Sequence, residues 1–126
     1  MRLNPDCIRD ILFSVEERSD FNKFMQYVPS QNHDSFPRFK NYSSDEVLYH
    51  IKQCELSGLI IVSNWGLAPM VLIKDLSPEG HEFLANIRAD NNWNKTKEAA
   101  KKVGSESLSV LSQIAAQVIS NLIPKF

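Results

Sequence analysis

The stretch SSDEVLYHIKQCELSGLIIVSNWGLAPMVLI, residues 43–73, decides the fold class of this chain. Ser43 or Ser44 is a favourable helix cap, and the acids of the following turn suit the positive end of the helix dipole. Apolar residues then recur at the spacing of one helical face. Gly58 predicts the end of this helix, because glycine readily adopts the left-handed conformation found just after a last helical turn.

Two apolar runs follow this glycine. Residues 59–62 and 70–73 are rich in the branched side chains that favour strands. The residues between them, 64–69, include the asparagine, glycine and proline that are typical of turns. We therefore predict a β-hairpin directly behind the helix.

Further helices flank this central unit. Asn4-Pro5-Asp6 and Ser77-Pro78-Glu79 each combine a capping side chain, a proline at the first helical position and an acid. They predict one helix that ends near Ser19 and another that begins at residue 78. Gly80 lies inside the second helix, where glycine costs about 1 kcal/mol relative to alanine. We expect the backbone to approach the hairpin closely there.

The remaining segments complete the order of elements. Residues 20–42 mix apolar and chain-breaking residues irregularly and predict either a short helix or a strand. Helical patterns cover residues 93–103 and 106–123. The connectivity predicts an α+β fold: a winged helix, with a two-stranded hairpin as its wing, followed by additional C-terminal helices. We expect residues 1–92 to form the winged-helix domain and residues 93–126 a helical extension.

The composition is that of a small globular protein. The chain has 126 residues, of which 43% are hydrophobic, and this suits one domain. Its net charge of −1 provides no general attraction to nucleic acid. We expect Cys7 and Cys54 to be reduced core residues. Neither a signal peptide nor an apolar run of about 20 residues is present, so we expect a cytoplasmic protein without a membrane partner.

Four motifs have a familiar appearance: LNPDCIRDIL (3–12), YHIKQ (49–53), GLI (58–60) and LSPEGHEFLANIR (76–88). Together with the tail SLSVLSQIAAQVISNL (107–122), they resemble an uncharacterised family of small bacterial and prophage-encoded proteins. The resemblance implies a winged-helix fold and a mobile-element setting. It implies no substrate and no catalytic residue.

The sequence contains few residue spacings that are typical of catalytic or metal-binding sites. His50 and Cys54 are four residues apart and form at most half of a metal site, for which His33, His81 or Cys7 would have to supply further nitrogen or sulfur ligands. The glycines do not follow a phosphate-binding pattern, and no nucleophile motif stands out. We therefore expect a protein that is not an enzyme and that binds neither a metal nor a cofactor.

The helix before Gly58 occupies the recognition position of a winged helix. Helical geometry predicts that its outer face carries polar side chains able to contact bases or phosphates. The candidate DNA-binding residues are Arg38, Lys40, Tyr49, His50, Lys52, Gln53, Lys95, Lys97, Lys101 and Lys102. The same helix carries three acids against the single cation Lys52. The leading hypothesis is a dimeric DNA-binding regulator of bacterial or phage origin. The alternative is a protein–protein interaction module on the same scaffold, an adaptor or inhibitor that does not bind DNA.

The C-terminal helix is apolar over an unusually wide arc. Residues 107–124 contain no charged side chain. The arc is about twice the ~100° stripe that an ordinary surface helix buries. We favour self-association of the chain into a homodimer over burial within the domain. The predicted interface residues are Leu108, Leu111, Ile114, Ala115, Val118, Ile119 and Leu122. Trp65, near the hairpin tip, is interpreted either as a contact residue or as a side chain that folds back onto the hairpin or the first helix.

Overall fold

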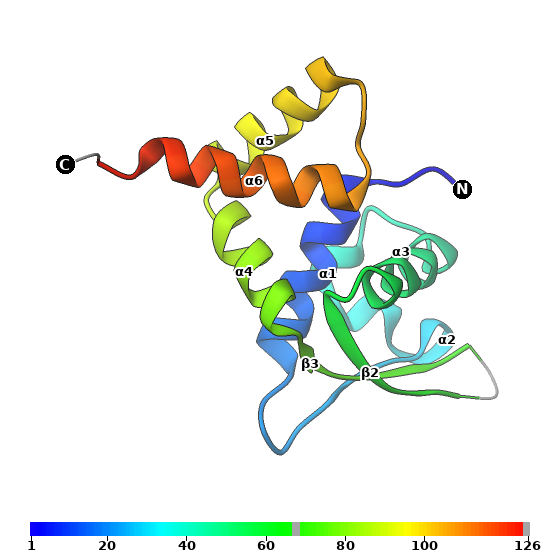
Figure 1. Ribbon diagram of the computed structural model, residues 1–126. Helices are drawn as coiled ribbons and strands as arrows, with labels where there is room; N and C mark the ends of the chain where they lie inside the picture. Colours follow the sequence, from blue (N-terminus) through cyan, green and yellow to red (C-terminus); the bar gives the residue numbers. More distant parts are fainter. Residues whose placement is uncertain (67–68, 125–126) are drawn as a thin grey trace.

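The computed structural model describes residues 1–66 and 69–124. Within this part, the chain forms six α-helices and a small three-stranded antiparallel sheet, which confirms the α+β class (Figure 1). The elements in chain order are α1 (Pro5–Arg18), β1 (Met25–Tyr27), α2 (Pro29–Asn32), the 3₁₀ turns η1 (His33–Ser35) and η2 (Pro37–Phe39), α3 (Ser44–Leu56), β2 (Ile60–Trp65), β3 (Val71–Leu76), α4 (Pro78–Ile87), α5 (Asp90–Val103) and α6 (Leu108–Leu122).

The predicted helix starts are confirmed by their caps. The Asn4 side chain accepts hydrogen bonds from the backbone nitrogens of Asp6 and Cys7, at 3.1 and 3.4 Å. Ser43 caps α3 by accepting a hydrogen bond from the backbone nitrogen of Glu46 at 3.1 Å. Gly58 follows α3 with a φ of +73°, the left-handed conformation that was expected of it.

The sheet contains one strand more than the predicted hairpin. Strands β2 and β3 pair as expected, and β1 pairs with the other edge of β3, so that the order is β1-β3-β2. Met25 lies opposite Ile73, and Tyr27 lies opposite Val71. The segment 20–42 thus supplies both a strand and short helical turns. Residues 67 and 68 of the predicted turn lie outside the described residues.

An aromatic cluster holds the irregular segment after β1. Tyr27, Phe36 and Phe39 are all buried. The Tyr27 ring meets the other two edge-on, with ring centroids 5.4 and 5.6 Å apart, and Phe36 stacks on Phe39 at 5.0 Å. Such aromatic pairs stabilise a segment through large buried area and favourable ring geometry. Side-chain packing therefore fixes a segment whose residues follow no regular period.

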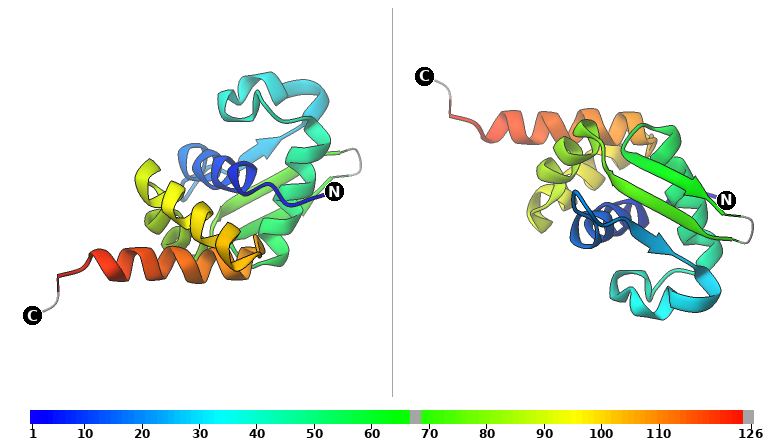
Figure 2. Two further views of the ribbon diagram at one scale, coloured as in Figure 1. Left: turned by 90° about the horizontal axis from the view of Figure 1, so that it is seen from above. Right: turned by 90° about the horizontal axis from the view of Figure 1, so that it is seen from below.

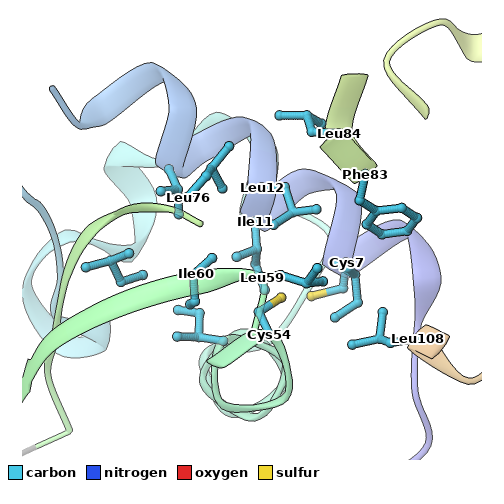
Figure 3. Close-up of a cluster of buried hydrophobic side chains, with 14 of the residues drawn as sticks. Cys7, Ile11, Leu12, Cys54, Leu59, Ile60, Leu76, Phe83, Leu84 and Leu108 are labelled. Carbon is cyan, nitrogen blue, oxygen red and sulfur yellow. The ribbon is translucent and has the colours of Figure 1, made fainter. Parts of the chain in front are cut away.

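Helix α1 lies at the centre of the molecule. It contacts α3 on one side, α4 on the other and β3 at the sheet (Figures 1 and 2). Its apolar face packs into a core to which α3, the sheet and α4 contribute (Figure 3). Cys7 and Cys54 are buried free thiols in this core, as predicted, and burial raises the pKa of both. These two cysteines are therefore poor nucleophiles.

Gly80 sits at a tight junction between α4 and the start of β2. A Cβ atom at this position would collide with the backbone carbonyl of Leu59. The Ser77 hydroxyl caps α4 by accepting a hydrogen bond from the Gly80 nitrogen at 2.9 Å, and it donates one to the carbonyl of Gly58 at 2.6 Å. The close approach expected from the sequence is confirmed.

The buried core continues into the last two helices. Trp93 and Ala100 of α5 and Leu111 of α6 are all buried, so the core crosses the boundary expected at residue 92. The Trp93 indole nitrogen also donates a hydrogen bond to the carboxylate of Asp6 in α1, at 2.8 Å. None of the helices in residues 1–66 and 69–124 combines the length and the apolar character needed to span a bilayer.

Candidate functional site

The outer face of α3 is the surface on which the predicted site depends. Val47, Ile51 and Cys54 point into the core and are fully buried. Lys52 is exposed on the opposite side, while Tyr49 and Gln53 are half-buried at its margins. For these three residues the sequence identified the faces of the helix correctly.

The prediction that His50 faces outward from α3 is wrong. This side chain is fully buried. The backbone nitrogen of Asn4 donates a hydrogen bond to Nε2 at 2.8 Å, so Nδ1 carries the proton and donates it to the carbonyl of Glu46 at 2.7 Å. Both ring nitrogens are therefore engaged within the chain. The buried imidazole is therefore withdrawn from the outer face of α3, and it joins the N-terminal segment to this helix.

The hairpin is attached to α3 through a small polar cluster. The Trp65 indole nitrogen donates a hydrogen bond to Oε1 of Glu55 at 3.1 Å. The same oxygen lies 2.9 Å from Nζ of Lys52, which also lies 5.1 Å from the centroid of the Trp65 ring. The Trp65 side chain thus contacts α3, and neither the hairpin nor the first helix expected from the sequence supplies these partners.

Several predicted DNA-binding cations are held in ion pairs. Both oxygens of Glu17 accept hydrogen bonds from the Arg38 guanidinium, at 2.9 and 2.8 Å. This hydrogen bonding lowers the pKa of the Glu17 carboxyl below its ordinary value. Nζ of Lys97 lies 2.9 Å from Oδ1 of Asp6, in the first turn of α1. These pairs leave little net positive charge around Arg38 and Lys97.

The remaining predicted cations do not gather around α3. Lys40 is exposed just before α3 begins. Lys95, Lys101 and Lys102 are exposed on α5, which lies at the opposite end of the molecule from the hairpin (Figure 1). The ten predicted DNA-binding residues thus come from several elements, and the α5 lysines lie away from the hairpin.

The predicted dimer interface divides into two parts. Leu108, Leu111 and Ala115 are buried within the chain's own core, so their assignment to an intermolecular surface is corrected. The reason is that α6 packs against both α4 and α5, which cover this stripe. Ile114, Val118 and Ile119 are half-buried, and Leu122 is 54% exposed. Only the second half of the helix retains the exposed apolar surface that the prediction required.

In residues 1–66 and 69–124, no three histidine, cysteine, aspartate or glutamate side chains converge so that they could hold a metal ion. The half-site of His50 and Cys54 lies in the core, where the imidazole is already hydrogen-bonded.

These observations define a small α+β protein in which helix α3 presents a mixed polar and apolar outer face next to a hairpin. The chain belongs to the family of hypothetical proteins DUF2513, which matches residues 2–106. It is also 32% identical over 126 residues to an uncharacterised protein of Haemophilus influenzae, an alignment that covers 98% of this chain and 99% of that protein. No solved structure matches the chain. The relationship agrees with the uncharacterised family expected from the sequence motifs.

Proposed function

We propose that this protein is a non-enzymatic winged-helix module that binds another protein through the outer face of α3 and the adjoining hairpin. The winged-helix assignment is supported by the order of elements: α3 runs through Gly58 directly into β2 and β3, and β1 completes the sheet from the other edge of β3. In this arrangement α3 takes the position of a recognition helix. The fold alone does not decide what that helix binds.

The proposal rests on the charge balance of α3, which is negative. The helix has Asp45, Glu46 and Glu55 against one cation, Lys52, which Glu55 already engages. A helix that enters a DNA groove faces phosphates on both sides, so an excess of acids opposes binding.

The apolar content of the same face supports a protein partner. Leu56 is 70% exposed, and Leu48 and Tyr49 are partly exposed. Exposed leucine and tyrosine beside charged rim residues are typical of protein–protein interfaces. The partner surface that fits best is an apolar groove with basic residues at its edge, which would meet the carboxylates of α3.

Affinity capture with a matched pair of variants tests this proposal. Leu56→Asp places a charge on the α3 face, whereas Val103→Asp places one at a similarly exposed apolar residue at the end of α5. The tagged protein should retain a stoichiometric partner from a nuclease-treated lysate of the cells that carry the gene. The Val103→Asp variant should retain it too, and Leu56→Asp should lose it. Equal retention by both variants would contradict docking through α3.

DNA binding is the second candidate, and the position of α3 is the observation that favours it. Lys52, Gln53 and Tyr49 lie on the accessible side of this helix, where a recognition helix meets base edges and phosphates. A gel-shift experiment on random duplex DNA at about 50 mM salt distinguishes the two functions, because counterion release favours binding there. A shift that disappears in Lys52→Ala, with a slope of roughly −3 to −5 in log affinity against log salt, would replace the docking proposal.

The cellular setting and the assembly are part of the same proposal. The Haemophilus relative is bacterial, which supports a bacterial origin for this chain. We place the protein in the cytoplasm and in a mobile-element context on the basis of the sequence motifs. We also propose a homodimer that forms through α6.

A further inference from the structure

Helix α6 has two distinct faces, one apolar throughout and one that becomes apolar toward the end of the helix. The first contains Leu108, Leu111 and Ala115, which are buried against α4 and α5. The second half of the helix continues past these neighbours and extends away from the rest of the molecule (Figures 1 and 2). Ile123, the residue after the helix, is 59% exposed there.

The second face has a graded composition. Its members are spaced alternately three and four residues apart, which aligns them along one side of the helix. They are Ser109, Ser112, Ala116, Ile119 and Ile123. The side chains of this face are small in the first half of α6 and large in the projecting half. A row of this kind is complementary to a copy of itself that runs in the opposite direction, because each large residue then lies over a small one.

A hollow adjoins the small end of this face. It has a volume of about 430 Å³ and lies between the end of α3, the start of α4 and the first half of α6. Ser57 and Leu59 line it from the α3–β2 turn, Glu79 from α4, and Ser109 and Ser112 from α6. The chain therefore carries both an exposed apolar helix end and a partly apolar hollow to receive one.

We propose that two copies of this chain pair through α6 in an antiparallel, two-fold arrangement centred on Ala116. With the axis at this residue, Ile123 lies opposite the partner's Ser109, and Ile119 lies opposite the region of the partner's Ser112 and Gln113. Each projecting end then covers the hollow of the other copy. This interface is independent of what α3 binds.

The charges and the symmetry identify a second copy as the occupant. A two-fold interface places each patch against itself, so charges of one sign near the axis repel one another. Residues 107–124 contain no charged side chain. The amide nitrogen of Gln117 donates a hydrogen bond to the side-chain oxygen of Asn121 at 3.0 Å, on the opposite side of the helix from Ile119. The α6 surface therefore suits a partner that is uncharged and graded in the same way, and Glu79 at the hollow meets no like charge from the partner's residues 107–124.

Neighbouring exposed residues provide a matched test. Ala116 and Gln117 are both exposed, so replacing either by arginine should leave the fold intact, as circular dichroism and thermal melting would verify. Light scattering coupled to gel filtration should give the wild-type protein twice the 14.4 kDa mass of the chain. Ala116→Arg should give a monomer, because two like charges would meet at the axis. Gln117→Arg should remain a dimer.

Cysteine cross-linking locates the axis. Ala116→Cys should form an interchain disulfide under mild oxidation, since a residue at a two-fold axis meets its own copy, whereas Gln117→Cys should not. A wild-type protein that is monomeric at high micromolar concentration would overturn the proposal. A dimer that survives Ala116→Arg, or that cross-links through Gln117→Cys and not Ala116→Cys, would overturn the interface.

Discussion

Gly80 allows α4 to pack closely against the start of β2, because glycine has no side chain. The carbonyl of Leu59 occupies the space that a Cβ atom would need. Ser77 strengthens the same junction, because its hydroxyl bridges the Gly58 carbonyl and the Gly80 nitrogen. Position 80 is therefore constrained by the backbone of another element, which cannot move as a flexible side chain would.

We predict that Gly80→Ala destabilises the protein by about 1–3 kcal/mol, the usual cost of overpacking. Helix propensity alone predicts the opposite sign, a gain of about 1 kcal/mol. Urea denaturation decides between the two. Ala85→Gly, at an exposed site of the same helix, serves as the control and should lose about 1 kcal/mol from propensity. A Gly80→Ala variant more stable than the wild type would show that the junction opens readily.

At the scale of elements, α3 separates a buried stripe from an outer face of mixed polar and apolar side chains. We predict that Ile51→Ala lowers the free energy of unfolding by about 2–5 kcal/mol, since this side chain is fully buried. Gln53→Ala, two residues along, should change it by less than about 0.5 kcal/mol. Equal losses in chemical denaturation would mean that Gln53 also contributes to the core.

The elements that could be predicted from the sequence are those with local signals. Caps such as Asn4 and Ser77 act within one turn, and Gly58 ends a helix through its own conformation. Strand β1 could not be assigned, because three residues become a strand only by pairing with β3, more than 40 residues later. The aromatic contacts of Tyr27 with Phe36 and Phe39 are likewise invisible to periodicity.

The candidate site was predicted less well, because the contacts that fix its residues also join parts of the chain that are distant in sequence. The outward position of Lys52 follows from helical spacing alone. The burial of His50 depends on the backbone of Asn4, and the ion pair of Arg38 depends on Glu17, both distant in sequence. A helical wheel gives the width of the apolar arc of α6, but not which half of it the chain itself covers.

At the scale of the whole molecule, α6 is both a core element and a projection. We predict that removing residues 117–126 leaves a folded monomer, because Leu108, Leu111 and Ala115 remain in place. Removing residues 105–126 should abolish cooperative unfolding, because it deletes these buried side chains and uncovers α4 and α5. Gel filtration and thermal melting distinguish the two truncations. A stable monomer from the longer deletion would show that α6 is dispensable for the core.

The central position of α1 has a consequence for the synthesis of this protein. Helix α1 precedes the elements that cover it, and some of its contacts reach residues more than 75 positions further along the chain. Asp6 accepts its hydrogen bond from Trp93, and the Arg9 guanidinium binds the carbonyl of Ile87 at 3.1 Å and Asp90 at 2.9 Å. Because such distant contacts form late, α1 lacks its full cover until α4 and the start of α5 have been translated, although α3 and β3 can pack against it earlier. Nascent chains of this protein therefore keep part of the apolar face of α1 exposed until α4 has been made, when chaperones have the greatest opportunity to bind them.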